Sequence, residues 1–288
     1  MNKLLTLSLS LPLVACVVGA DTPGGNNGNG GGGSSSSGSG SGGSGADHIS
    51  ANMMWSGTMP VAGPLTVDKG VTLTIAAGTT VAFAPGGSIT VNGLLDVQGT
   101  KASVVHLAPA TAGGHHSGLS IPDGGELKMT YGVQVGGGIE VNGGKVTISD
   151  TLMSQSSGDF LVVGTGTVDV SYSAIGLEPG AGTDTTHCDM HFGSPGASIK
   201  VTHTNVSTAV FGIMLYGGTG VDLTYDNWFA NQMTDVDTYS GAGGDFSYGW
   251  FAKGAPVAGS GATIIYTNPS ATRLPAATAD PVKGTGPR

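Results

Sequence analysis

Residues 187–192, which read HCDMHF, carry the densest group of chemically active side chains in the sequence. Side chains alternate between the two faces of a strand, so we expect Cys188 inside, as a small apolar core residue. His187, Asp189 and His191 then share the outer face. Two imidazoles and a carboxylate can bind zinc or a softer divalent ion, with water completing the shell. Same-face neighbours stand about 6.6–7 Å apart between Cα atoms, so a solvated polar face, or a ligand-binding groove for sugars at Asp189 and His191, are the alternatives.

A second candidate group places carboxylates beside aromatic rings. The Asp226 carboxylate is close in sequence to an aromatic ring, because Asp226 lies two residues before Trp228. Tyr216 and Trp250 could add exposed rings at the same end of the repeat. Rings stack on sugar faces and acids bond sugar hydroxyls, so Tyr216, Asp226 and Trp250 are candidate ligand-binding residues, and oxygen ligands of this kind would also suit calcium. The alternative is a set of core aromatics with acids in the turns.

The elements that must position these residues are short repeated segments, in which apolar and polar residues alternate between glycine-rich turns. Their first and third positions are always apolar and are expected to face inward, whereas in the second column Asp169, Lys200 and Asp222 alternate in sign. Neighbouring rungs lie about 4.8 Å apart, so this alternation is favourable. A Gly-, Thr- and Pro-rich insertion occupies residues 178–186, and short-strand repeats of this kind indicate a solenoid. Five segments align without gaps: residues 127–131, 146–150, 168–172, 199–203 and 221–225.

The last column of this alignment indicates the role of a further histidine, His203. His203 shares its column with Tyr131, Tyr172 and Tyr225. We therefore expect His203 to belong to a ring stack and not to act as a ligand.

Two columns follow in the next turn. Asn205 and Asn227 share one of them, where stacked side-chain amides can satisfy one another. Trp228 shares the other with Ile175 and Val206. We expect Trp228 to be buried.

Residues 71–83, VTLTIAAGTTVAF, and residues 87–100, GSITVNGLLDVQGT, resemble the entry rung of secreted right-handed parallel β-helix proteins. The resemblance is to the pectate-lyase-like superfamily and covers roughly residues 50–230. It implies an all-β, right-handed parallel β-helix solenoid, which we assign to residues 47–240, with an irregular C-terminal cap or tail at 241–288. Glycine accounts for 53 of the 288 residues, as tight turns between flat sheets require.

The resemblance also implies where catalysis should be sought. Its polysaccharide-cleaving members use calcium-binding carboxylates with a basic residue, paired aspartates with a Gly-His-Gly segment, or two aspartates with an arginine. This chain has no arginine before Arg273, and residues 114–118, GHHSG, have no paired aspartates nearby. We therefore expect a non-catalytic carbohydrate-binding or structural surface module. The alternatives are a divergent polysaccharide lyase or hydrolase, and a metal-binding module at His187, Asp189 and His191 with calcium or zinc as its ion.

The N-terminus carries an export signature. Residues 4–15 form an apolar run of 12 residues, which is shorter than the roughly 20 residues of a membrane-spanning helix and typical of a signal peptide. The run ends at residues 13–16, LVAC, which resemble the lipobox of bacterial lipoproteins and imply cleavage of residues 1–15 and lipidation of Cys16. An ordinary secretory signal with an incidental cysteine is the alternative. Residues 16–46 continue as a Gly/Ser/Asn-rich linker, expected to be a flexible tether that reaches roughly 30 Å.

The net charge and the number of cysteines limit which partners and which disulfide bonds we expect. The chain has 10 Lys and Arg against 19 Asp and Glu, a net charge of −9 at pH 7, and no basic cluster, which argues against nucleic acid. The acidic exterior also disfavours anionic polymers unless divalent ions bridge them. Cys188 is the only cysteine besides Cys16, so we expect no intramolecular disulfide. We expect a monomer held to the membrane by its lipid, at the outer membrane, the cell surface or the periplasm, with a polysaccharide as partner.

Overall fold

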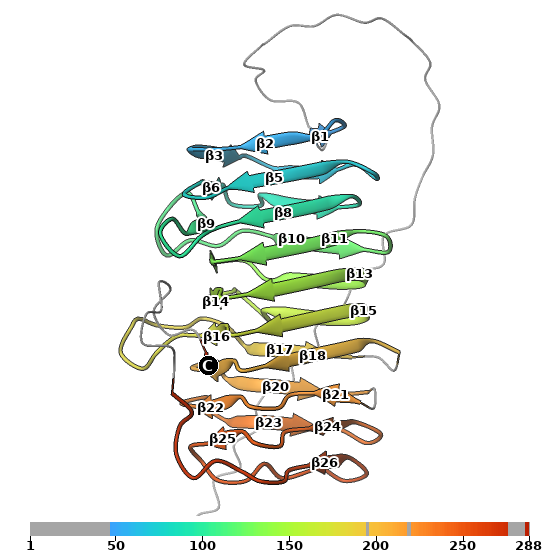
Figure 1. Ribbon diagram of the computed structural model, residues 1–288, viewed down its shortest axis with the longest axis vertical. Coiled ribbons are helices and arrows are strands. Elements are labelled where there is room, and N and C mark those ends of the chain that lie inside the picture. The colour runs from blue at the N-terminus through green and yellow to red at the C-terminus, as the bar shows by residue number, and fades with distance from the viewer. Residues whose placement is uncertain (1–46, 194–195, 218–219, 276–285, 288) are drawn as a thin grey trace, which may run out of the picture. The chain divides into compact units, whose positions relative to one another are not determined.

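The computed structural model describes residues 47–193, 196–217, 220–275 and 286–287. The predicted signal peptide, the linker and the lipidated Cys16 lie outside these ranges. Every named element within them is a β-strand (Figure 1). The described residues include no helix with the length and apolar character that crossing a bilayer requires.

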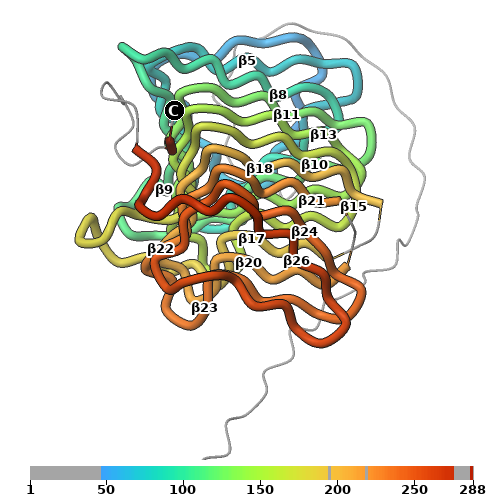
Figure 2. Tube along the Cα trace, turned by 60° about the horizontal axis from the view of Figure 1, so that its bottom comes forward, coloured from blue at the N-terminus to red at the C-terminus, as the bar shows by residue number. Residues whose placement is uncertain are grey.

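The strands stack as a parallel β-solenoid of about ten turns (Figure 1, Figure 2), which confirms the predicted all-β, parallel β-helix class. Each full coil gives two strand positions to a larger sheet and one to a smaller sheet. The larger sheet has 17 strands: β1 (Asp47–Ile49), β2 (Met53–Trp55), β4 (Pro64–Val67), β5 (Thr72–Ala76), β7 (Ser88–Val91), β8 (Leu94–Gln98), β10 (Gly118–Pro122), β11 (Glu126–Thr130), β13 (Ile139–Ser149), β15 (Leu161–Ser171), β17 (Cys188–Phe192), β18 (Ser198–Thr202), β20 (Phe211–Leu215), β21 (Val221–Asp222), β23 (Thr234–Thr238), β24 (Gly243–Asp245) and β26 (Thr263–Ile265). The smaller sheet has nine strands: β3 (Thr58–Val61), β6 (Thr80–Phe83), β9 (Val105–Pro109), β12 (Gly132–Val135), β14 (Leu152–Ser154), β16 (Ala174–Gly176), β19 (Asn205–Ser207), β22 (Asn227–Phe229) and β25 (Trp250–Phe251).

The coils are in register, so a side chain in a sheet lies beside its equivalents in the coils before and after. Val146 pairs with Leu127 on one side and with Val168 on the other. Lys200 likewise pairs with both Asp169 and Asp222. The gapless alignment of the five segments is therefore confirmed along its length.

Apolar side chains fill the inside of the coil. Burying a side chain of this size contributes roughly 1.5–3 kcal/mol, and a continuous column supplies such a contribution in every coil. One inward column, with exposure of 0–1 %, consists of Leu73, Leu95, Leu127, Val146 and Val168.

A second inward column lies in the smaller sheet and ends near the largest fully buried side chain, Trp228. Its earlier members are Met153, Ile175 and Val206, and all four residues are 0 % exposed. The indole stacks on Phe251 with 5.4 Å between ring centroids. The predicted burial of Trp228 is confirmed.

The predicted pair of asparagines is also present in the smaller sheet. Asn227 Nδ2 donates a hydrogen bond of 2.8 Å to Asn205 Oδ1, and both residues are 1 % exposed. Leaving either amide unpaired there would cost roughly 1–3 kcal/mol, so the pairing keeps two polar side chains in a buried position.

Four rings form an outer ladder at the turn between the two sheets. Tyr172, His203, Tyr225 and Tyr248 follow one another with centroid distances of 5.1, 4.9 and 4.7 Å; the first pair is tilted by 39° and the other two pairs are stacked. This confirms that His203 belongs to a ring stack. All four residues have a left-handed backbone, with φ between 51° and 62°. That conformation costs a non-glycine residue roughly 1–2 kcal/mol, and each ring pair offsets about 0.5–1.5 kcal/mol of it.

Tyr131 was expected in the same stack but does not reach it. It has the same left-handed backbone, with φ of 47°. Asp150, a carboxylate in place of a ring, occupies the turn position between Tyr131 and Tyr172. The stack therefore begins two coils later than predicted, at Tyr172.

The coil continues past residue 240, where the repeat was expected to end. β24 pairs in parallel with β26, and β25 pairs with β22. The period is hidden in the sequence because Gly244 occupies the column of Val221. Phe246 fills the space this leaves, since a Cβ on Gly244 would lie 3.0 Å from the Phe246 ring. The predicted boundary at residue 240 is therefore wrong.

After β26 the chain turns back along the side of the coil (Figure 1). The Arg273 guanidinium forms an ion pair with Glu178 and lies 4.0 Å from the centroid of the Phe229 ring. Next to it, Leu274 N–H donates to Asn227 Oδ1 at 2.8 Å, and Asn227 Nδ2 donates to Leu274 O at 3.0 Å. This return segment therefore contacts coils well before the last one.

Trp228→Ala should be among the most destabilising single substitutions in the coil. Removing a fully buried large aromatic side chain typically costs about 3–5 kcal/mol. Urea unfolding followed by circular dichroism measures the loss. Met233→Ala, at a side chain that is 69 % exposed, is the control and should change stability by less than about 0.5 kcal/mol. Equal effects of the two substitutions would contradict the assigned core.

Candidate functional site

Two neighbouring coils bring four polar side chains together on the outside of the larger sheet. His187 immediately precedes β17, and Asp159 precedes β15 in the coil before. The backbone ties the two coils at this point, because Phe160 N–H donates to Cys188 O at 2.8 Å. We call these four residues the Asp159 cluster: Asp159, His187, Cys188 and His191.

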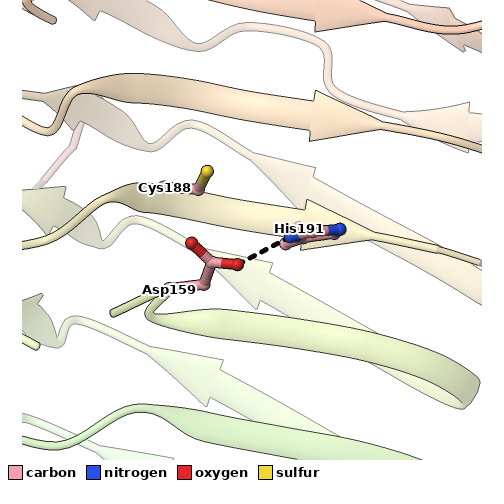
Figure 3. Close-up of side chains that lie close together, drawn as sticks. All are labelled: Asp159, Cys188 and His191. Atoms are coloured by element: carbon pink, nitrogen blue, oxygen red, sulfur yellow. Dashed lines mark hydrogen bonds and ion pairs between the residues drawn. The ribbon is translucent and has the colours of Figure 1, made fainter. Parts of the chain in front are cut away.

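The Asp159 carboxylate lies near Cys188 and is hydrogen-bonded to His191 (Figure 3). Its Oδ1 accepts a hydrogen bond of 2.9 Å from His187 Nδ1, and its Oδ2 accepts one of 2.6 Å from His191 Nδ1. Cys188 Sγ lies 3.1 Å from His187 Nδ1. The potential ligand atoms of Asp159, Cys188 and His191 all lie within 4.8 Å of one another. Cys188 has no exposed surface, whereas the His187 side chain is 52 % exposed, so the thiol is at the base of a half-open site.

Asp189 is not part of the cluster, and the prediction that it shares an outer face with the two histidines is wrong. Asp189 and the next residue, Met190, are both 0 % exposed, so the strand breaks its alternation at this step. The neighbouring coil shows the direction of the side chain. Gly212 is level with Asp189, and a Cβ there would lie 3.2 Å from the buried Trp228 ring. With Asp189 turned inward, Cys188 faces the cluster.

The interior makes Asp189 an unusual carboxyl. Burial raises its pKa well above the usual range, the Asp184 carboxylate raises it further, and the backbone of Ser207 lowers it only in part. Neither carboxyl oxygen makes a hydrogen bond of ordinary geometry with the described residues. Its neutral form is therefore favoured, and an external ligand does not reach it.

The Asp159 cluster has the opposite electrostatics. Burial raises the pKa of Asp159, but hydrogen bonds from His191, His187 and Cys188 outweigh it and hold the pKa at about 2. Burial and then the Asp159 carboxylate raise the pKa of the Cys188 thiol. At neutral pH Asp159 is therefore ionised, while Cys188 is a protonated thiol.

This arrangement is not that of a nucleophilic triad. A triad uses one imidazole whose two nitrogens face the nucleophile and the acid. Here both histidines turn Nδ1 toward Asp159, and Cys188 also meets His187 at Nδ1. Since the thiolate is the reactive form of cysteine, a buried thiol with a raised pKa is a poor nucleophile. The cluster is suited to binding.

Aromatic rings flank both histidines. Tyr216 stacks on His191 with 5.0 Å between centroids, and Tyr239 stacks on Tyr216 at 4.0 Å. Phe211 packs against His187 at 5.3 Å in an edge-on arrangement. Burial and then the hydrogen bond with Tyr239 raise the pKa of Tyr216. We call Tyr216 and Tyr239 the tyrosine row; they are 36 % and 41 % exposed, and stacking covers the ring faces that they turn toward one another.

A groove of about 280 Å³ opens beside the cluster and is lined by serines together with Glu140 and Asp159. A column of six residues on the outside of the larger sheet joins this groove to the tyrosine row, and we call it the outer column. Neighbouring coils are about 4.8 Å apart, so the outer column is roughly 24 Å long. A larger depression, of about 620 Å³, lies over β21, β24 and β26, but its lining has neither histidine nor cysteine. The outer column consists of Ser120, Glu140, Val162, His191, Met214 and Asp237.

Two other predicted ligand residues lie away from this face. Asp226 is 0 % exposed, and its Oδ1 accepts a hydrogen bond of 2.8 Å from Thr204 N–H. Burial raises its pKa well above the usual range, and the backbone of Thr204 lowers it in part. Trp250 is half-buried in β25 and packs against Phe229 at 6.2 Å. Asp226 therefore braces a turn, and a ligand on the outside of the coil does not reach it.

The sequence pattern indicated the two histidines and Tyr216 as site residues but not Asp159 or Tyr239. Asp159 lies 28 residues before His187, outside the five aligned segments. A signal was present, because Leu161 and Val163 pair with Met190 and Phe192 in the structure. Aligning those two apolar pairs brings Asp159 next to Cys188.

Comparisons with protein-family models, with curated proteins and with solved structures found no match for this chain. Its functional interpretation therefore rests on the Asp159 cluster, the groove and the tyrosine row.

Asp226→Asn should make stability less dependent on pH. A folded-state pKa above the unfolded value means that the folded state loses stability as pH rises above the usual aspartate range. The amide keeps the Oδ1 acceptor for Thr204 but carries no charge. The free energy of unfolding of the variant, relative to that of the native protein, should therefore rise with pH by at most about 1.4 kcal/mol per pH unit. This difference should vanish near pH 3.8.

Urea unfolding over a pH series measures this difference. Asp245→Asn is the matched control, since Asp245 is partly exposed and its Oδ1 accepts from Ser247 N–H at 2.9 Å. A gain that is the same at every pH would contradict the assignment of Asp226 as a buried acid with a raised pKa.

Proposed function

We propose that this protein is a non-catalytic, lipid-anchored binding module of the bacterial cell envelope, and that a neutral polysaccharide lies along the outer column of its larger sheet. One observation carries the proposal: the serine-lined groove, the Asp159 cluster and the tyrosine row follow one another on one face over successive coils. Rigid solenoid faces suit extended ligands. Membership of the right-handed, pectate-lyase-like folds is part of the same proposal and stays a prediction.

The chemistry of the face favours a neutral chain of hydroxyl groups. Serine hydroxyls in the groove and the hydroxyls of the tyrosine row can each donate or accept a hydrogen bond. The carboxylates of Glu140, Asp159 and Asp237 accept further bonds from sugar hydroxyls. An anionic polymer would meet Glu140 and Asp237 in the outer column and Asp159 beside it, and the column holds no lysine or arginine, so its approach would be unfavourable.

Hydrolysis, the second candidate function, has weaker support. Paired-carboxylate catalysis needs a general acid with a raised pKa in reach of the substrate. Hydrogen bonds lower the pKa of Asp159 to about 2. The carboxyls whose pKa burial raises most, Asp189 and Asp226, are 0 % exposed. Groups with the acidity of a catalytic acid are therefore inside the coil, away from the proposed ligand.

The double variant Tyr216→Ala/Tyr239→Ala should weaken polysaccharide binding at least about tenfold, which corresponds to roughly 1.4 kcal/mol. Size-exclusion chromatography of the purified protein with intact neutral and acidic polysaccharides identifies the ligand, and affinity electrophoresis gives its dissociation constant. Co-elution with intact neutral chains is expected. Shortened chains would support the hydrolase instead, and no shift with any polysaccharide would overturn the proposal.

Tyr225→Ala/Tyr248→Ala is the matched control. These tyrosines are 39 % and 40 % exposed and are also stacked, but they belong to the ladder at the turn. They should leave the dissociation constant unchanged. Equal losses in both double variants would mean that binding depends on general aromatic exposure and not on the outer column.

The lipid anchor has a separate test. Cys16→Ser should move the protein from the membrane fraction to the soluble fraction of a bacterial host, because no acyl chain can then be attached through sulfur. Detergent phase partitioning with metabolic labelling by a fatty acid measures the change. Labelling that persists in the variant would refute lipidation at Cys16.

A further inference from the structure

We propose that the Asp159 cluster binds one zinc ion, with Asp159, His187, Cys188 and His191 as its ligands. The inference goes beyond polysaccharide binding and does not depend on it. It also replaces the ligand set expected from the sequence, because Asp189 is turned into the core.

The donor set selects the metal. It offers one carboxylate oxygen, two imidazole nitrogens and one sulfur, and zinc binds such donors in four-coordinate tetrahedral sites. Calcium takes six to eight oxygen ligands. Three of the four donors here are nitrogen or sulfur, so calcium does not fit, and a softer divalent ion does.

The spacing is close to what zinc requires. Zinc–ligand distances of about 2.0–2.3 Å at tetrahedral angles put neighbouring donor atoms roughly 3.3–3.7 Å apart. Asp159 oxygens lie 2.9 Å from His187 Nδ1 and 2.6 Å from His191 Nδ1, and Cys188 Sγ lies 3.1 Å from His187 Nδ1. Each of these gaps needs to open by no more than about 1 Å. The ligand atoms of Asp159, Cys188 and His191 already lie within 4.8 Å of one another. His187 is outside that group, so its half-exposed ring has to move toward His191 to complete the set. Each imidazole then carries its proton on Nε2, at the far side of the ring, and Cys188 releases its thiol proton to solvent as the sulfur binds the metal.

The cluster is held in shape by its surroundings. The backbone hydrogen bond from Phe160 to Cys188 fixes the two coils that carry the ligands. Phe211 packs on the His187 ring and Tyr216 on the His191 ring, so each imidazole is supported on one side and needs only a small shift to bind the metal. Such support from neighbouring side chains orients metal ligands and commonly changes affinity 10- to 100-fold.

The cluster is open enough to admit an ion. The side chains of His187, His191 and Asp159 are 52 %, 30 % and 22 % exposed, while Cys188 at the base is 0 % exposed. An ion therefore enters from solvent past the histidines and reaches the sulfur last. Asp159 also lines the neighbouring groove.

The test uses the untagged purified protein, freed of metal by a chelator, with Cys16→Ser in every sample so that Cys188 is the only thiol. Competition with a chromophoric zinc chelator gives stoichiometry and affinity. One zinc ion per chain is expected. Cobalt(II) should give tetrahedral absorption bands together with a sulfur-to-metal charge-transfer band, and only the latter should vanish in Cys188→Ala if cobalt remains bound.

His191→Ala and Asp159→Asn should each weaken zinc binding at least about tenfold. His187→Ala serves where a more buried change prevents folding, because its side chain is half-exposed and leaves the backbone contacts in place. Thermal melting in the presence of the chelator checks that each variant is folded.

His48→Ala is the matched control. His48 Nδ1 contacts Asp68 Oδ1 at 2.8 Å, a histidine–aspartate pair without a second histidine or a thiol, so zinc binding should not change. The proposal is overturned if the parent protein binds no zinc, if binding is equal in the cluster variants and the parent, or if cobalt gives no sulfur charge-transfer band. Since the metal is the only ligand in the assay, a failure of polysaccharide binding leaves this outcome unaffected.

Discussion

Parallel register between coils is the constraint on which the rest of this structure depends. Each coil pairs its backbone with the coil before and the coil after, so a residue's closest lateral neighbours are its own equivalents about 4.8 Å away. Residue types therefore have to be compatible with their own repetition. Asn205 on Asn227 and His203 on Tyr225 meet that demand by hydrogen bonding and by stacking. The Asp159 cluster uses the same constraint differently, since it combines unlike side chains from two coils whose register is fixed by their backbones.

The same constraint determines how much could be read from the sequence. The five aligned segments predicted the pairing of Lys200 with Asp169 and Asp222, because inward apolar positions repeat visibly there. The direction of Asp189 could not be predicted, since strict alternation describes a straight strand and this strand turns a second residue inward beside Met190. The end of the repeat was misplaced for a related reason: Phe246 reaches into a column from elsewhere and lets a glycine stand in it.

The insertion at residues 178–186 sets up the face on which the candidate site lies. Asp184 is its anchor: Oδ1 accepts from Gln155 N–H at 3.1 Å and from Thr186 N–H at 3.0 Å, and Oδ2 accepts from Thr208 Oγ1 at 3.0 Å. These bonds connect the insertion to the coils on either side. The chain thus reaches His187 from a loop that is held by hydrogen bonds. His187 N–H then donates to Gly158 O of the preceding coil at 2.9 Å. An irregular segment that is hydrogen-bonded to the coils on both sides lets a repetitive fold present a non-repetitive group of side chains.

The return segment gives the C-terminal end of the solenoid a mechanical character of its own. A stack of coils held only by its neighbours opens by peeling, one coil after another from the free end. Here Arg273 forms an ion pair with Glu178, and Leu274 hydrogen bonds to Asn227, so the return segment is bound to coils before the last one. A pull on that end loads these contacts together in shear before the terminal coils can separate. Resistance to unfolding by force, or by a processive protease that starts from the C-terminus, then comes from the contacts of the return segment on the side of the solenoid and not from the last coil.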